Sequence, residues 1–384
     1  MTFTDFDWLH AFLPTPNPEL AQHLTRTFIK KHVLQALQQG LNHPEYATLK
    51  LAKYFRQTRA LGSKDRRRAA DISYGIIRSE GFLRRCGATE PQEWVEFYHL
   101  LMKGEAPKGS MISPAADYAA ALSLPEKIAT EWLELHSSEA LALGQKLMLQ
   151  PPTYIRANLQ ASSRDAIQKS LHKENIHTKI VSDSDSALRL THRANLIACS
   201  AYKNGLIEIQ DLSCQRFCQD LDDFLGGLRG VKILDLCAGA GGKSLALAAR
   251  GADIFAADPR SHALKELSKR AARARAQVSL KIPKKSDLVL LDVPCSGTGR
   301  LAREPALRWK YQKSEPPQHC STQKNLLVQA TKLADQYIVY ATCSLLKEEN
   351  TPSLEGWEKK YSTWYWPHQQ EGDGFYWAIF KKES

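Results

Sequence analysis

Residues 231–258 read VKILDLCAGAGGKSLALAARGADIFAAD, and this stretch decides the fold. The short apolar strand VKILDL runs into a glycine-rich turn, a helix follows that ends at Gly251, and the strand ADIFAAD comes next. A strand, a helix and a second strand in this order form a βαβ unit, and such units build parallel sheets with helices on both faces. The segment therefore predicts an α/β fold.

The pattern continues toward the end of the chain. Residues 261–276 (SHALKELSKRAARARA) predict a helix, and three apolar runs predict further strands: SDLVLLDVP at 286–294, QYIVYATCS at 336–344 and DGFYWAIFKK at 373–382. The last two runs are expected to include an antiparallel pair at a sheet edge.

The chain before this sheet divides into two further stretches. Apolar residues recur at helical spacing through most of residues 1–140, which predicts a helical domain. Residues 141–225 contain two short strand-like runs, TYIRANL and HTKIVS, on either side of a helix capped by Ser162 or Ser163. We therefore expect a helical domain at 1–140, a small α/β subdomain at 141–225 and the α/β domain at 226–384.

Composition limits the class of protein. Lys and Arg number 52 and Asp and Glu 41, and the formal charge of +11 indicates a polyanionic partner, nucleic acid before an anionic membrane. A merely basic soluble protein is the alternative. No apolar run is long enough to span a bilayer, and the first residues do not resemble a secretory signal. The eight cysteines show no CxxC spacing, so we expect reduced thiols and no structural metal.

The glycine-rich turn is compatible with three kinds of cofactor. The tail Gly242-Lys243-Ser244 imitates a phosphate-binding P-loop, but Cys237 stands where the first glycine is required. A nicotinamide fingerprint that begins at Gly239 ends on Ser244 instead of a third glycine. S-adenosylmethionine needs a glycine-rich bend without a full phosphate nest, so it is the third candidate.

Two acidic residues at strand ends favour S-adenosylmethionine. Asp235 ends the first strand, where a carboxylate meets the positive methionyl end, and Asp258 ends the next strand, where a carboxylate meets ribose hydroxyls. The alternative role for Asp258 is to cap the following helix.

Two cysteines at neighbouring strand ends suggest covalent chemistry. The segment SDLVLLDVPCSGTGR delivers Asp292 and Cys295, and YIVYATCS delivers Cys343. Ligands of open α/β sheets bind at the carboxyl ends of the strands, so both thiols should face one crevice. A thiolate that adds to carbon 6 of a pyrimidine activates carbon 5 for methylation, and an acid beside ring nitrogen 3 assists the addition. An inert core position is the alternative for either cysteine alone.

These segments resemble a known family. LDLCAGAGGKS, ADPRSHALKEL, LLDVPCSGTGRLAREPALRW and YATCSLLKEEN look like the successive motifs of bacterial RNA cytosine-5 methyltransferases of the RsmB/Sun (Fmu) group. PTYIRANL and GLIEIQDLSCQ resemble its pre-catalytic motifs, and DRRRAADISYGIIR resembles its NusB-like helical domain. The resemblance implies a Rossmann-like S-adenosylmethionine methyltransferase sheet preceded by an all-α, NusB-like RNA-binding domain.

The resemblance also implies roles for single residues. Cys343 would be the nucleophile, Cys295 would assist release of the methylated base, and Lys243 and Asp292 would line the catalytic pocket. The residues implied for S-adenosylmethionine are Cys237, Ala238, Gly239, Ala240, Gly241, Gly242, Lys243, Asp258, Arg260 and Asp292. Two departures are visible: the usual loop AAPGGK is AGAGGK here, and the strand QVSLKIPKK lacks the acid that normally contacts adenine.

Basic and aromatic residues follow the DVPCS motif directly, and we expect Arg300, Arg303, Arg308 and Trp309 to contact RNA. The predicted function is S-adenosylmethionine-dependent cytosine-5 methylation of 16S ribosomal RNA by a cytoplasmic monomer that needs neither a metal nor a membrane. A transfer RNA substrate and a non-catalytic RNA-binding ribosome assembly factor remain the alternatives.

Overall fold

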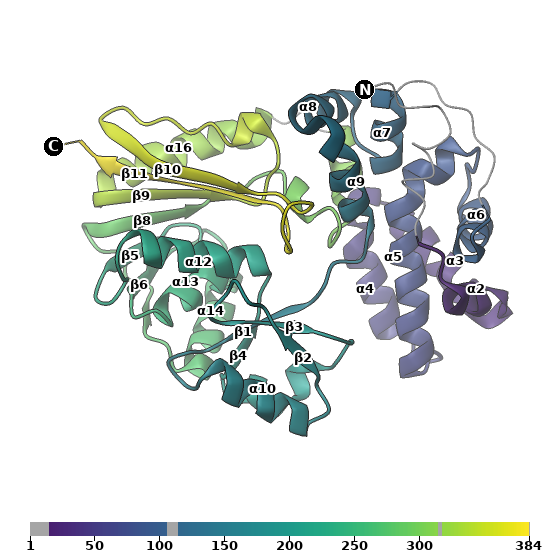
Figure 1. Cartoon of the computed structure of the whole chain (residues 1–384), viewed down its shortest axis with the longest axis horizontal. Coiled ribbons are helices and arrows are strands. Elements are labelled where there is room, and N and C mark those ends of the chain that lie inside the picture. The colour runs from purple at the N-terminus through teal and green to yellow at the C-terminus, as the bar shows by residue number, and fades with distance from the viewer. Residues whose placement is uncertain (1–14, 106–113, 314–316, 384) are drawn as a thin grey trace. The chain divides into compact units, whose positions relative to one another are not determined.

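The computed structural model describes residues 15–105, 114–313 and 317–383 (Figure 1). The chain forms two compact units: Met1–Pro151 with Ser296–Pro316, and Pro152–Cys295 with Pro317–Ser384. This division differs from the three stretches expected from the sequence. The small α/β subdomain and the large sheet share the second unit, and residues 296–316 leave the sheet and join the first.

The first unit is helical, as its periodicity predicts. Its long helix α5 contacts most of the other helices of the unit, and Ile72, Ile76, Ile77 and Leu83 of α5 are buried. Its α-helices are α2 (Pro18–Thr25), α3 (Thr27–Leu41), α4 (Ala47–Gln57), α5 (Ser63–Arg85), α6 (Pro91–Lys103), α7 (Pro114–Leu122), α8 (Glu126–His136), α9 (Ala140–Met148) and α15 (Leu307–Lys313). Short 3-10 turns lie at Pro44–Tyr46 (η1), Ser137–Glu139 (η2) and Thr298–Arg300 (η4).

A buried arginine ties residues 296–316 to the helices of the first unit. Arg308 of α15 is 1% exposed, and its guanidinium donates hydrogen bonds to the carbonyls of Leu122, Leu147 and Leu301 at 2.8, 2.9 and 3.0 Å. Burial lowers the pKa of Arg308 to about 9. A buried cation is tolerated only when its donors are satisfied, and here the ends of two helices and a turn supply the acceptors.

The second unit begins with a small antiparallel sheet in the order β2-β3-β1-β4. Its helix α10 is capped by Ser163, whose hydroxyl accepts from the backbone N–H of Ala166 at 3.3 Å, which confirms one of the two predicted caps. The elements are β1 (Tyr154–Ala157), α10 (Arg164–Lys173), β2 (Thr178–Ile180), β3 (Ala187–Leu190), η3 (Leu196–Ala198), α11 (Ser200–Lys203) and β4 (Ile207–Ile209).

The rest of the second unit is a seven-stranded sheet in the order β10-β11-β9-β8-β5-β6-β7. Strands β9, β8, β5, β6 and β7 run parallel, and β11 pairs antiparallel with β9 on one side and with β10 on the other, so the predicted Rossmann-like α/β fold is confirmed. The elements are α12 (Leu212–Phe224), β5 (Lys232–Asp235), α13 (Gly242–Ala248), β6 (Asp253–Ala256), α14 (Ser261–Ala274), β7 (Val278–Ser279), β8 (Ser286–Asp292), α16 (Pro317–Leu333), β9 (Ala334–Thr342), η5 (Lys347–Glu349), β10 (Trp357–Tyr365) and β11 (Phe375–Lys382).

Helices cover both faces of this sheet (Figure 1). Leu288 and Leu290 of β8 pack in the core with α12 and α13, whereas Val289 and Leu291 pack in the core with α16. All four side chains are fully buried. A strand that is buried on both faces has no polar alternation, which explains why its sequence is a continuous apolar run.

The predicted antiparallel pair is β9 with β11, but β11 is not the edge. Strand β10 pairs with β11 and forms the outer strand, and its sequence WEKKYSTWY is largely exposed. Charged side chains such as Lys359 and Lys360 discourage pairing of this edge with another chain.

The turn between β5 and α13 depends on Gly241. Its φ of +83° lies in the left-handed region, and a Cβ at this position would lie 2.7 Å from Cγ of Leu267 in α14. Both the backbone conformation and the close approach of α14 therefore require glycine.

We expect Gly241→Ala to lower the free energy of unfolding by about 2–4 kcal/mol, since a left-handed alanine and an overpacked contact both cost energy. Gly226→Ala is the matched control: its φ is +71°, but nothing lies within 4 Å of the added Cβ. Gly226→Ala should lower the free energy of unfolding by only about 1 kcal/mol, as measured by urea denaturation of the full chain. Equal losses in the two variants would contradict the packing argument.

Candidate active site

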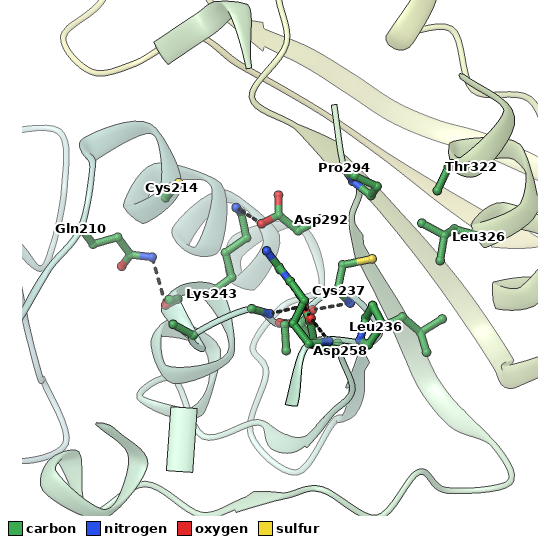
Figure 2. A pocket seen from close by; sticks show the side chains of 17 residues that line it. Gln210, Cys214, Leu236, Cys237, Lys243, Asp258, Asp292, Pro294, Thr322 and Leu326 are labelled. Carbon is green, nitrogen blue, oxygen red and sulfur yellow. Dashed lines mark hydrogen bonds and ion pairs between the residues drawn. The ribbon is translucent and has the colours of Figure 1, made fainter. Parts of the chain in front are cut away.

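A cavity of about 630 Å³ opens at the carboxyl ends of β5 and β8 (Figure 2). The strand order reverses here, because β6 follows β5 on one side and β8 lies on the other. Loops after neighbouring strands diverge at such a switch point and leave a crevice. The cavity is lined by Gln210, Cys214, Asp235, Leu236, Cys237, Ala238, Gly239, Ala240, Gly242, Lys243, Asp258, Pro259, Arg260, Asp292, Pro294, Thr322 and Leu326.

Asp235 lies at the floor of the cavity and is 1% exposed. Its carboxylate accepts a hydrogen bond from the Ser244 hydroxyl at 2.6 Å and one from the backbone N–H of Cys237 at 3.3 Å. Burial raises the pKa of Asp235 to about 7, and the nearby Asp292 carboxylate adds to the rise. The charge of Asp235 therefore changes near neutral pH.

Asp258 has the opposite electrostatic environment. Arg260 donates to this carboxylate from its backbone N–H, its Nε and its Nη2, at 2.8–2.9 Å, and the backbone N–H of Gly239 donates at 2.9 Å. These hydrogen bonds, those of the Arg260 side chain first, lower the pKa of Asp258 to about 2. The carboxylate stays ionised and holds the glycine-rich turn against the loop after β6.

Lys243 at the start of α13 reaches across the cavity to Asp292 at the end of β8 (Figure 2). The two side chains form an ion pair of 2.6 Å, and the ammonium also lies 5.0 Å from the ring centre of Phe375. Burial by itself would lower the pKa of Lys243, but the Asp292 carboxylate outweighs this effect and raises that pKa above its ordinary value. Lys243 is therefore a fixed cation beside the loop that carries Cys295.

The structure brings Cys295 and Cys343 together, with their sulfur atoms 3.4 Å apart. Strands β8 and β9 are parallel neighbours, and beyond their last paired residues the backbone N–H of Val293 still donates to the carbonyl of Ala341 at 3.0 Å. The chain then turns at Pro294, which lines the cavity. The convergence of the two thiols therefore follows from the register of the two strands.

A buried polar network holds the loop after Cys343. Thr342 donates its hydroxyl hydrogen to Oδ1 of Asn350 at 2.6 Å, and Nδ2 of Asn350 donates to the carbonyls of Ser344 and Leu346, each at 2.9 Å. Sequence reasoning assigned Asn350 no role, although it ends the motif YATCSLLKEEN. Its amide satisfies backbone carbonyls that a loop of this shape leaves unpaired.

Gln210 is a second residue that sequence reasoning missed. Its Nε2 donates to the carbonyl of Gly242 at 3.0 Å, and its Oε1 accepts from the buried Arg156 at 2.7 Å. The motif GLIEIQDLSCQ contains Gln210, so the signal was present. Thr322 and Leu326 of α16 also line the cavity, and no local motif marks them.

The four residues expected to contact RNA have different environments. Arg300, paired with Glu304, and Arg303 are partly exposed. The prediction is wrong for Arg308, since it is buried and its donors are used by backbone carbonyls. Trp309 is 6% exposed and lines a hollow of the first unit instead of an open surface.

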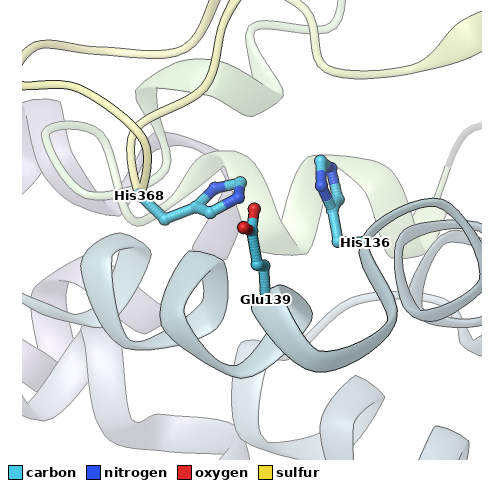
Figure 3. A group of neighbouring side chains, drawn as sticks. All are labelled: His136, Glu139 and His368. Carbon is cyan, nitrogen blue, oxygen red and sulfur yellow. The ribbon is translucent and has the colours of Figure 1, made fainter.

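Two expected absences concern membranes and metals. In the described part of the chain, no helix combines the length and the apolar character that a bilayer crossing requires. Figure 3 draws His136 and Glu139, at the end of α8 and in η2, together with His368 of the loop between β10 and β11. His136 and Glu139 belong to the first unit and His368 to the second, so no metal site is argued from these three side chains.

Comparison with known proteins shows what the domain that holds the cavity is similar to. The sequence model of the family "16S rRNA methyltransferase RsmB/F" matches residues 227–360. The ribosomal RNA small subunit methyltransferase B of Proteus mirabilis (strain HI4320) is 30% identical over 255 residues, which cover 61% of this chain and 60% of that protein. The chain thus spans about 60% of the length of the first curated relatives it matches.

Solved structures share the fold. The protein PH0851 superposes with a TM-score of 0.71 and 18% identity, and the match covers 91% of this chain and 98% of that one. A methyltransferase homologue from Pyrococcus horikoshii superposes with a TM-score of 0.58 and 22% identity, over 71% of this chain and all of that one. The parallel sheet and the glycine-rich turn agree with this match, and residues 227–360 are similar to the methyltransferase domain of the RsmB/F family.

Proposed function

We propose that this protein is an S-adenosylmethionine-dependent RNA methyltransferase that modifies carbon 5 of a cytosine in 16S ribosomal RNA. The observation that carries the proposal is the pair of thiols, Cys295 and Cys343, 3.4 Å apart on the loops that follow β8 and β9. Methylation at carbon 5 of a pyrimidine needs a nucleophile at carbon 6 and a base at carbon 5, and two adjacent thiols can serve both needs.

The cavity fits S-adenosylmethionine by size and by chemistry. A volume of about 630 Å³ is in the range of cofactor sites, and the left-handed Gly239 and Gly241 let the backbone approach a ligand closely. Asp235 and Asp258 offer carboxylates, which suit a ligand with cationic groups and hydroxyls better than one with phosphates. When bound, S-adenosylmethionine would supply a methyl group on a sulfonium, whose sulfur leaves as a neutral thioether.

The two thiols divide the chemistry on the base. The Cys343 thiolate forms a bond with carbon 6, and the electron pair of the 5,6 double bond makes carbon 5 nucleophilic. After methylation, Cys295 accepts the proton from carbon 5, the 5,6 double bond forms again, and Cys343 leaves as a thiolate. This order of roles follows the family resemblance, while the 3.4 Å separation supports their joint action on adjacent ring atoms.

Lys243 and Asp292 are proposed to assist the addition. Asp292 would stand beside ring nitrogen 3, which gains a proton as the thiolate adds to carbon 6. The Lys243 ammonium pairs with Asp292 at 2.6 Å and would hold this side chain in place beside the base. The raised pKa of Lys243 keeps its positive charge in the site during the addition.

Ribosomal RNA is the substrate class that the comparisons favour. The matched family and the curated relatives are named as methyltransferases of 16S or small-subunit ribosomal RNA. A formal charge of +11 suits a polyanionic substrate. We also propose that the first unit is a NusB-like RNA-binding module and that the protein acts as a cytoplasmic monomer. No observation favours a transfer RNA substrate or a non-catalytic role.

We expect Cys295→Ala to accumulate a covalent RNA–protein adduct in the presence of S-adenosylmethionine, because the base can be methylated but its carbon 5 proton is not removed. Denaturing gel electrophoresis with labelled 16S RNA detects the adduct. The double variant with Cys343→Ala should form none and should lose methylation by at least about 1,000-fold.

Cys320→Ala is the matched control, since this thiol lies outside the cavity lining. It should methylate RNA like the parent protein and accumulate no adduct. An adduct that persists without Cys343, or no adduct under conditions where Cys295→Ala binds RNA tightly, would contradict the mechanism.

Affinity for S-adenosylmethionine should rise with pH. The pKa of Asp235 is raised to about 7, so the group is mostly protonated at pH 6 and ionised at pH 8. A cationic ligand binds better to the ionised form, and a pKa near 7 makes binding about tenfold weaker at pH 6 than at pH 8. Isothermal titration calorimetry at both values checks this. In Asp235→Asn the affinities at pH 6 and pH 8 should be equal. If the tenfold difference persists in this variant, another group is responsible for the pH dependence.

A further inference from the structure

The first unit contains a hollow that the methyltransferase chemistry does not use. Its volume is about 550 Å³, close to that of the cavity at β5 and β8. All of its lining residues belong to the first unit. They are Leu41, Pro44, Glu80, Gly81, Arg84, Arg85, Ala119, Ala120, Ser123, Leu124 and Trp309.

The lining is positively charged. Arg84 and Arg85, from the last turn of α5, contribute two guanidinium groups, and Arg84 also lies 4.8 Å from the ring centre of Trp94. Glu80 is the acidic residue of the lining and is 3% exposed. Its carboxylate pairs with Arg84 and accepts from the Ser123 hydroxyl at 3.1 Å, so the lining residues together carry one formal positive charge.

Two buried arginines lie close in sequence to the lining residues. Arg308 precedes the lining residue Trp309, and its guanidinium donates to backbone carbonyls, which do not neutralise it. Arg78, two residues before the lining residue Glu80, is 8% exposed and donates from Nε to the carbonyl of Ala302 at 2.8 Å. Burial and the neighbouring Arg78 lower the pKa of Arg308, and Glu80 opposes this effect. An anion in the hollow would offset charge that the fold concentrates there.

We propose that this hollow binds one nucleotide of a single-stranded RNA segment, with the phosphate at Arg85 and Arg84. Guanidinium groups recognise phosphate oxygens through paired hydrogen bonds. The remaining wall, formed by Leu41, Pro44, Leu124 and Trp309, is apolar and suits the body of a base. The volume accommodates one nucleotide, not a duplex. The inference rests on the proposed function in taking RNA as the source of the phosphate.

Two variants of the full-length protein test the hollow by different means. Arg85→Glu reverses a charge of the lining, and Ala120→Phe fills the space without changing any charge. Arg56→Glu is the matched control, an exposed arginine on α4 outside the lining. Binding of a fluorescein-labelled single-stranded 12-nucleotide RNA is followed by fluorescence anisotropy as a function of salt, and circular dichroism verifies that each variant is folded.

Both hollow variants should bind this RNA at least tenfold more weakly, and the control should stay within twofold. The slope of log K against log salt should become shallower by about 0.7 for each phosphate group that a variant no longer neutralises. Loss of binding in Arg85→Glu with full binding in a folded Ala120→Phe would show a general charge effect and overturn the proposal. Equal binding by all three variants would overturn it as well.

Cytidine monophosphate distinguishes a strand from a free nucleotide. Preference for the RNA by at least 100-fold supports the proposal, whereas equal or tighter binding of the mononucleotide, abolished in both hollow variants, would assign the hollow to a free nucleotide. Methyl transfer is measured separately. If the parent protein binds RNA through the hollow but never methylates it, the proposed function fails and this inference stands.

Discussion

The reversal of strand order at β5 is the constraint on which the second unit depends. Because β6 lies on one side of β5 and β8 on the other, the chain must leave the two central strands in opposite directions. The space between their ends can only be filled by side chains or by a ligand. The side chains at these strand ends, Asp235 and Asp292, are too short to fill the space, so a cavity remains.

The three carboxylates of this cavity show how position determines charge. Asp235 is buried and accepts few hydrogen bonds, so its pKa rises. Asp258 accepts hydrogen bonds from Arg260 and from a backbone N–H, so its pKa falls. Asp292 faces Lys243 instead. One cavity thus offers a titrating acid, a permanent anion and half of an ion pair. Side chains of a single chemical type can therefore serve different roles within a few ångströms.

The sequence predicted the parallel core well because burial on both faces leaves an unmistakable apolar run, as in β8. It did not predict β10, whose residues EKKYST look like a loop; this strand forms because β11 offers it a free edge. The glycine-rich turn and both thiols were found by motif. Gln210 donates to the carbonyl of Gly242, which is distant in sequence, and Asn350 donates to carbonyls of its own loop, whose shape the spacing of residues does not encode. The prediction that Arg308 contacts RNA was wrong because the carbonyls that accept its hydrogen bonds lie on helices distant in sequence.

The boundary between the two units has a mechanical consequence. Cys295 is the last residue of one segment of the sheet unit, and Ser296 is the first residue of the segment that joins the helices. The boundary of the two units therefore falls on the peptide bond that follows a cysteine of the thiol pair. An insertion directly after Cys295 would lengthen the connection between the loop that carries this thiol and the segment that Arg308 anchors to the helices of the first unit.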